Sequence, residues 1–221
     1  RSNNTGNWVI WDTTRLPQSG IIQGSYLNAN SSDAEESPSG SNDIEFTDTG
    51  FTLQDNGIYS NSSGDTFIYM AFKGSYADYV SDVNTDGTID SRVKANPATG
   101  FSIASYTGTG ANATIGHSLG VQPSMVIVKR RDAVENFTVY HASTGSSQYA
   151  YLDLTQAFST ATSVWQGVDP TSSVFSIGTS ATTNASGGTY IAYCFSSVAG
   201  YSYISSYSGT GANGHKITTG F

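Results

Sequence analysis

The segment whose residue types best suit metal chemistry is an acidic stretch near the middle of the chain. Its oxygen-bearing residues occupy alternating positions and Gly87 stands where a sharp turn is needed, as in the first nine positions of an EF-hand calcium loop. The twelfth position holds Val93 instead of a bidentate Glu, and no flanking helices are evident. The alternatives are a structural calcium ion and an unmetallated, Asx-rich turn. The candidate ligands are Asp82, Asn84, Asp86, Thr88 and Asp90.

Catalytic residues are not expected. The chain has no nucleophile elbow and no His-Glu zinc motif, and no two of its histidines, His117, His141 and His215, have metal-ligand spacing. One acidic stretch has enough carboxylates for a glycosidase pair, but acidic loops are usually solvated. We therefore expect a protein that is not an enzyme. The stretch contains Asp33, Glu35, Glu36, Asp43, Glu45 and Asp48.

The aromatic residues suit either sugar binding or protein contacts. Trp8, Trp11, Trp165 and the tyrosines present apolar rings with polar edges, which stack on sugars. Trp8 and Trp11 lie an odd number of positions apart on one predicted strand, so they face opposite sides of the sheet and at most one belongs to the core. The other is interpreted as an interface anchor, because Trp and Tyr are enriched at protein contacts.

The composition is that of a β-rich protein. The 221 residues include 24 Gly, 14 Tyr and 10 Phe, and only 12% are charged. Short apolar runs alternate with Gly, Ser, Asn and Thr turns about every 8–12 residues. A net charge of -8 argues against a nucleic-acid partner, and the basic triplet at 129–131 is interpreted as a solvated face. No run approaches the roughly 20 apolar residues of a membrane span, so no membrane insertion is expected.

Two features bear on the compartment. The single Cys194 excludes an internal disulfide framework, and its setting within residues 190–195 predicts a buried thiol on a strand. Six sequons permit glycosylation in a secretory host. They are Asn3, Asn30, Asn61, Asn112, Asn136 and Asn184. The chain opens on Arg1 instead of Met, which is interpreted as processing or as excision from a longer polypeptide.

Comparison of the sequence with itself finds three matched pairs of segments. Each pair shares aromatic residues, glycines and the alternation of a half-buried strand. The pairs are 102–112 with 203–213, 136–141 with 7–12, and 174–178 followed by 184–195 with 50–54 followed by 61–72. Chance does not explain the agreement, so the sequence predicts a repeat.

The order of the segments is permuted between the two copies. Repeat B runs intact from 100 to 200, whereas repeat A is divided between 1–74 and 201–221, with a polar connector at 75–99. Joining Phe221 of one copy to Arg1 of the next restores the order, except for a segment equivalent to 122–129. Repeat A is expected to be completed by 201–221 of the same or a neighbouring chain. Three interpretations remain: a window from a longer tandem array, a subunit whose C-terminal strand completes a neighbour, or a truncation with no consequence for assembly.

The predicted fold class is therefore all-β, with two tandem β-sandwich repeats of jelly-roll or immunoglobulin-like type and a permuted boundary. Pairing of an incoming strand with an incomplete sandwich is favourable, and a head-to-tail contact that does not close builds an open filament. Copies of the chain itself are the expected partners. The candidate assembly residues are Tyr203, Ile204, Tyr207, Phe221, Trp8 and Trp11.

The repeat resembles a known but uncharacterised domain. Residues 100–120, 125–129, 137–141 and 188–195, with 8–12, 26–32 and 66–72 in the split copy, are similar to a domain that recurs in structural and tail-fibre-like proteins of marine bacteriophages, often beside modules similar to concanavalin A-like lectins. The resemblance implies an extracellular or virion-surface location and no known activity. The expected function is a subunit of a fibre, and the alternative is a glycan-binding module of a tail fibre or adhesin.

Overall fold

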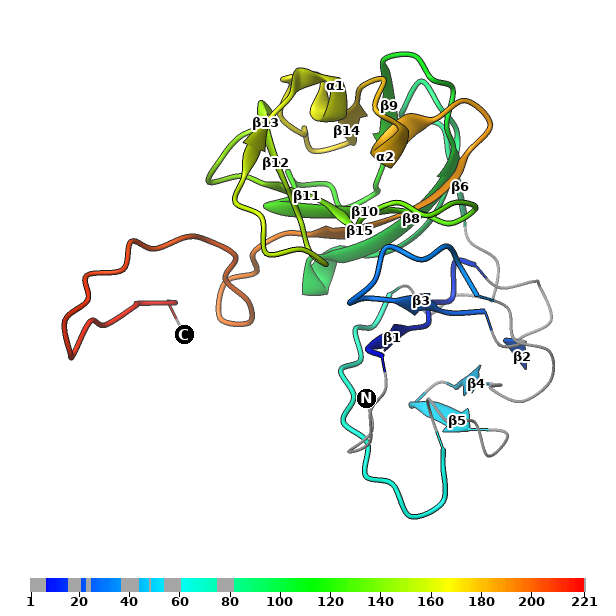
Figure 1. The fold of residues 1–221 in the computed structure, drawn as a ribbon, viewed down its shortest axis with the longest axis vertical. Coiled ribbons are helices and arrows are strands. Elements are labelled where there is room, and N and C mark those ends of the chain that lie inside the picture. The colour runs from blue at the N-terminus through cyan, green and yellow to red at the C-terminus, as the bar shows by residue number, and fades with distance from the viewer. Residues whose placement is uncertain are drawn as a thin grey trace.

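The computed structural model describes residues 7–15, 21–22, 25–36, 44–47, 49–53, 61–74 and 82–220. Its largest element is an eight-stranded antiparallel sheet with the strand order β13-β12-β11-β10-β15-β8-β7-β6 (Figure 1). In chain order these strands are β6 (Asp82–Asn84), β7 (Ser91–Asn96), β8 (Phe101–Thr107), β10 (Met125–Arg130), β11 (Thr138–His141), β12 (Gln148–Tyr151), β13 (Ser159–Thr160) and β15 (Thr189–Phe195). The expectation of an all-β protein is confirmed.

The centre of the sheet is built from β8 and β15, in which large apolar residues point to both faces. Tyr190 lies opposite Tyr106 and Ala192 opposite Ala104, and the two tyrosine rings stack with their centroids 5.2 Å apart. Because side chains alternate along a strand, the intervening residues face the other side. Both strands are buried over most of their length, so both faces of the sheet must be covered.

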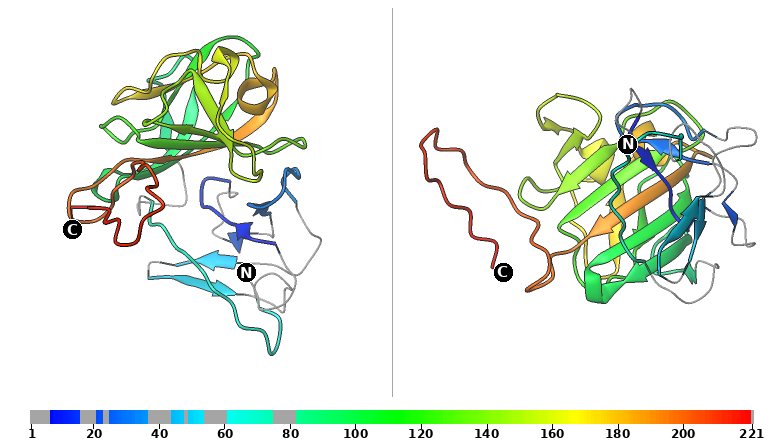
Figure 2. Two further views of the ribbon diagram at one scale, coloured as in Figure 1. Left: turned by 60° about the vertical axis from the view of Figure 1, so that its left-hand side comes forward. Right: turned by 90° about the horizontal axis from the view of Figure 1, so that it is seen from below.

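A second layer covers the inner face. It consists of the antiparallel pair β9 (Ala113–Gly116) and β14 (Val174–Ile177) with the short helices α1 (Thr162–Trp165) and α2 (Ala181–Asn184) (Figures 1 and 2). The core between the layers includes Ala104, Tyr106, Ile115, Val126, Val128, Tyr140, Trp165, Phe175, Ile177, Tyr190, Ala192 and Cys194. The buried thiol predicted at Cys194 is confirmed, and burial raises its pKa to about 12.

The outer face is covered by the N-terminal part of the chain, which comprises the described residues between 7 and 74. Leu27 is fully buried against the sheet in a second apolar cluster, in which its neighbours are Phe101, Ile103, Phe137, Ile191 and Tyr193. The N-terminal strands form two small sheets, β1 (Val9–Ile10) with β3 (Leu27–Asn28), and β2 (Ile21–Ile22) with β4 (Ile44–Phe46) and β5 (Phe51–Leu53).

The β1–β3 pair has a distinctive closing pattern. Val9 lies opposite Asn28, the amide of Ala29 donates to the carbonyl of Trp8 at 2.7 Å, and the amide of Trp8 donates to the side-chain oxygen of Asn30 at 2.8 Å. The end of the pair is thus held by one backbone hydrogen bond and by one hydrogen bond to the side chain of Asn30, two positions beyond Asn28.

The β11–β12 pair repeats this pattern. Thr138 lies opposite Tyr151, the amide of Leu152 donates to the carbonyl of Phe137 at 2.9 Å, and the amide of Phe137 donates to the side-chain oxygen of Asp153 at 3.0 Å. The sequence match of 136–141 with 7–12 therefore extends to the register and to the closing hydrogen bonds.

The expected connector at 75–99 needs correction for its described part. Residues 82–84 and 91–96 are strands of the large sheet, with Val93 opposite Ala104, and the 3₁₀ turn η1 (Pro97–Thr99) leads into β8. The strands were missed because β7 alternates weakly: Ser91 and Lys94 are buried beside Val93, so its inward positions are not all apolar.

The C-terminal segment departs from the sheet. Beyond the isolated bridge between Val198 and Ser202, residues 203–220 contain no strand and run away from the N-terminal part (Figures 1 and 2). Among the described residues, segment 203–220 pairs with no strand of the N-terminal part. No helix in the described residues is long and apolar enough to cross a bilayer.

Candidate functional site

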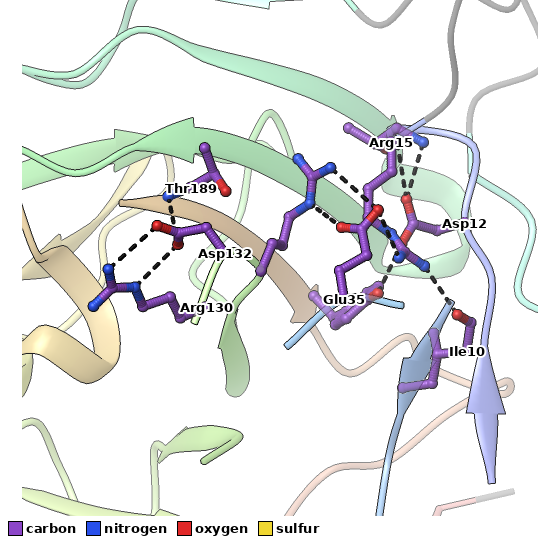
Figure 3. A network of polar contacts seen from close by, with 10 residues as sticks. Ile10, Asp12, Arg15, Glu35, Arg130, Asp132 and Thr189 are labelled. Atoms are coloured by element: carbon purple, nitrogen blue, oxygen red, sulfur yellow. Dashed lines mark hydrogen bonds and ion pairs between the residues drawn. The ribbon is translucent and has the colours of Figure 1, made fainter. Parts of the chain in front are cut away.

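A buried polar network ties the N-terminal part to the outer face of the sheet (Figure 3). The Nε atom of Arg15 lies 2.6 Å from Oδ2 of Asp12, and the two side chains are only 2% and 3% exposed. The same carboxylate oxygen accepts from the hydroxyl of Tyr193 at 2.8 Å. Burial alone lowers the pKa of Arg15, but attraction to Asp12, Tyr193 and Glu35 outweighs it and raises the pKa, so the guanidinium stays charged.

Glu35 extends the network to the end of β10. Its carboxylate accepts from Nε of Arg131 and, at 3.3 Å, from Nη2 of the same residue, while Nη1 of Arg15 lies 3.7 Å away. The backbone amide of Glu35 also donates to the carbonyl of Arg131 at 2.8 Å. One carboxylate therefore connects two arginines, one from each part of the chain.

Lys129 makes a second connection. Its Nζ donates to the carbonyls of Ser32, at 3.1 Å, and Glu135, at 2.6 Å, and lies 5.5 Å from the centroid of the Phe137 ring. Burial lowers the pKa of Lys129 from 10.5 to about 8, although Asp153, Glu135 and Asp33 act in the opposite direction. The predicted solvated face at 129–131 is thus wrong for Lys129, which is buried.

The pKa of Lys129 predicts a pH dependence of stability. Between about pH 8 and 10.5 the unfolded chain holds more protons at this residue than the folded chain, so the free energy of unfolding contributed by Lys129 rises with pH. We expect a rise of about 1–2 kcal/mol between about pH 7.5 and pH 9.5 in urea titrations, relative to Lys129→Met. The variant is the needed control because burial raises the pKa of Cys194 from 9.0 to about 12, which lowers stability above pH 9 in both proteins. Parallel pH profiles would contradict the prediction.

An apolar segment, residues 66–72, lies on the surface of the N-terminal part. Tyr69 and Met70 are 74% and 79% exposed, and Ile68 and Phe72 are more than half exposed. Tyr69 rests edge-on against Phe51, with the ring centroids 5.3 Å apart. A run of large exposed apolar side chains is typical of an interaction surface.

A second such segment, residues 203–208, leaves the sheet after β15. Tyr203 and Tyr207 are 55% and 71% exposed, whereas Ile204 is half-buried and its amide donates to Oγ of Ser197 at 2.9 Å. These are three of the predicted assembly residues. Phe221 lies outside the described residues.

The tryptophans predicted for assembly lie in the N-terminal part. Trp8 and Trp11 are both half-buried, and the ring of Trp11 packs against Tyr26 at a centroid distance of 6.4 Å. Trp165 is buried in the core, so it is not available for a sugar ring.

The predicted calcium loop is a β-hairpin turn between β6 and β7. Oδ1 of Asn84 accepts from the amide of Asp86 at 2.9 Å, and the amide of Thr88 donates to Oγ1 of Thr114 at 2.9 Å. A Cβ at Gly87 would overlap the Thr114 carbonyl, so close approach to β9 accounts for this glycine. Asp90 is exposed. The side chain of Asp82 lies outside the part of the chain that the structure describes.

The described residues contain no group of three His, Cys, Asp or Glu side chains that could hold a metal ion. His117 is buried, with its ring bonded to the carbonyl of Thr171 and the amide of Leu119, and His141 accepts from the amide of Ser143. These contacts give both rings structural roles.

Comparison with known proteins places the chain in a family. A family model described as a domain of unknown function (DUF7483) matches residues 1–75 and 77–221. The chain belongs to the DUF7483 family. No curated protein and no solved structure matches it. The DUF7483 match covers both the N-terminal part and the eight-stranded sheet.

The sequons of this DUF7483 member differ in accessibility. Asn30, Asn61 and Asn112 are exposed and Asn136 is half-buried, and Asn3 lies outside the described residues. Asn184 is fully buried, and its side-chain amide donates to the carbonyls of Ala111 and Gly178 at 2.6 and 2.7 Å. The prediction of a glycosylation site at Asn184 is therefore wrong for the folded protein.

The polar network was not predicted. The acidic stretch was interpreted as solvated, but Glu35 is paired with Arg131 and Glu36 accepts from Tyr26 and Asn28. Asp33 is exposed, Glu45 is half-buried, and Asp43 and Asp48 lie outside the description. The one available signal was the presence of Asp12 and Arg15 three positions apart, directly after an apolar run.

Proposed function

We propose that this protein is a structural subunit of an extracellular or virion-surface fibre, in which copies join head to tail by β-strand addition. The observation that carries the proposal is the exposure of segments 66–72 and 203–208. Their sequence counterparts, β15 and β8, are neighbouring strands at the centre of the large sheet. The chain thus exposes two apolar segments whose equivalents pair as strands elsewhere in the same fold.

The physical argument concerns exposed strands. A segment that presents apolar side chains and an extended backbone is a template for another strand, and strand addition gains both backbone hydrogen bonds and side-chain burial. The two segments lie in different parts of the molecule (Figure 1), so pairing one with the other joins different surfaces of successive copies. Such a heterologous contact, if it does not close into a ring, extends into a filament.

The other expectations fit this role. The sandwich character of the two repeats, the continuation of one polypeptide through several copies, the lack of enzymatic activity and the absence of nucleic-acid partners remain predictions. The likeness to a domain of phage tail-fibre-like proteins supports a location on a virion or cell surface. Glycan binding is the alternative function, and the burial of Trp165 removes one of its candidate contacts.

The proposal is tested by assembly without ligand. We expect the purified protein to form elongated particles at neutral pH in negative-stain electron microscopy and sedimentation velocity. Replacing Tyr203 and Tyr207 together by Ser removes two exposed rings that would be buried on pairing, and we expect it to abolish the particles. The matched control is Tyr201→Ser, which removes a 61% exposed ring outside the segment and should leave assembly unchanged. Compact single particles that bind an immobilised glycan panel would overturn the proposal in favour of the adhesin function.

A further inference from the structure

We infer that segment 66–72 of one copy pairs antiparallel with segment 203–208 of a second copy, in the register that places Met70 opposite Ile204. The inference rests on the proposed function and specifies its interface. The occupant is a second copy because segment 203–208 of the same chain lies away from the N-terminal part (Figure 2).

The register comes from the central pair of the sheet. In the match of 61–72 with 184–195, Met70 corresponds to Tyr193, and in the match of 203–213 with 102–112, Ile204 corresponds to Ile103. Tyr193 lies opposite Ile103 in the sheet. Transferring this pairing brings Met70 opposite Ile204 and fixes every other pair in the ladder.

The transfer is justified by another part of the two sequence repeats, in which the structure shows equivalent strand pairing. The β1–β3 and β11–β12 pairs share their register, their closing backbone bond and the bond from Trp8 or Phe137 to a side chain. The matched segments β1 and β11 therefore adopt matched pairings, down to individual hydrogen bonds.

A glycine provides an independent observation. Gly108, just after β8, approaches the carbonyl of Ala185 so closely that a Cβ there would overlap it, and its amide donates to the carbonyl of Gly188 at 2.8 Å. Its counterpart Gly209 has no atom within 4 Å of a Cβ position. The described residues make no close approach to Gly209, whereas docking in the inferred register brings it to the carbonyl of Ser62, the counterpart of Ala185.

The side chains suit the pairing on both faces. In the inferred ladder Tyr69 lies on one face with Tyr203 and Tyr207, and Met70 lies on the other with Ile204. This reproduces β15, which is buried on both faces. A one-residue slip would move every side chain to the opposite face, so the register is specified by the same alternation.

The test is disulfide trapping between copies. Met70 and Ile204 correspond to a facing pair, whose Cβ atoms in a sheet are about 4.5–5.5 Å apart, close enough for a disulfide after small adjustment. Met70→Cys and Ile204→Cys proteins are checked separately for wild-type sedimentation, then mixed and oxidised. We expect a covalent dimer of the two variants. The native Cys194 is fully buried and does not compete.

The register control is a mixture of Tyr69→Cys with Ile204→Cys, because these side chains would point to opposite faces. We expect at least about tenfold less dimer from this mixture, a difference that corresponds to about 1.4 kcal/mol. Wild-type particles with equal or no trapping in both mixtures would overturn the register and leave the proposed function standing. An absence of particles in the wild-type protein would overturn both. A Met70→Cys, Ile204→Cys double variant that cross-links only within one chain would overturn the assignment to a second copy.

Gly209→Ala gives a second readout that does not depend on cysteine chemistry. Overpacking a close contact is costly, so the concentration for half-assembly should rise by about tenfold or more while the unfolding midpoint of the single chain stays the same. The matched control is Gly50→Ala, where a Cβ also has no neighbour within 4 Å. Equal assembly of the two variants would contradict the inferred approach of Gly209 to the second copy.

Discussion

The Asp12→Ala variant is expected to loosen the attachment of the N-terminal part by about 3–5 kcal/mol, the usual loss when one partner of a buried ion pair is removed. Arg15 is 2% exposed and would keep only the carbonyl of Ile10 at 2.9 Å and the more distant Glu35. Tyr193 would also lose its acceptor. Native-state hydrogen exchange at the Glu35 amide measures the effect directly, because that amide bonds to Arg131 across the contact.

The control for this prediction is an ion pair on the surface. Asp132→Ala removes the partner of Arg130, whose Nε lies 3.0 Å from Oδ1 of Asp132 with side chains 19% and 39% exposed. Exposed pairs contribute below about 1 kcal/mol, so exchange at Glu35 should change little. If the two variants exchanged at the same rate, the network around Asp12 would not be what holds the N-terminal part in place.

The Asn184→Asp variant is expected to lower the free energy of unfolding by about 3 kcal/mol or more at neutral pH. The substitution keeps the shape but replaces an NH₂ group by an oxygen that faces the carbonyls of Ala111 and Gly178. The new carboxylate would be buried, so its pKa would rise and the loss should be smaller near about pH 4 than at pH 7. Urea titration at the two pH values measures both effects.

Asn112→Asp is the matched control for Asn184→Asp. It makes the same chemical change in another sequon, at an exposed side chain, and should alter stability by no more than about 0.5 kcal/mol. Equal unfolding midpoints for the two variants would mean that the bonds of the Asn184 amide to Ala111 and Gly178 do not contribute to stability.

The parts of the fold that the sequence predicted are those with short runs of apolar residues. Residues 189–195 and 101–107 carry aromatic and other apolar residues on both faces and are buried over most of their length, which is typical of strands at the centre of a covered sheet. β7 was missed because Lys94 is buried there, and a buried lysine is rare enough that any rule based on polarity places it outside.

Only part of the candidate site was predicted, because the sequence shows internal similarity but does not show which charged residues become buried. Tyr203 and Tyr207 were found by internal similarity alone, which needs no knowledge of packing. Asp12, Arg15 and Glu35 were not found, because a charged side chain on a loop is usually solvated and only the approach of two distant segments buries these three. The contact between Tyr193 and Asp12 spans 181 residues, a separation that local patterns do not register.

The position of β15 has a consequence for how the chain folds as it is made. β15 lies between β10 and β8 but is the last strand of the sheet in sequence. The edges of β10 and β8 that it will join therefore remain unpaired until residue 195 has been synthesised. The N-terminal part cannot dock before then either, because it docks on Tyr193 and the β8–β15 surface. Folding is therefore dominated by pairings far apart in sequence, which are slow, and during that interval the open edges are exposed to other nascent chains.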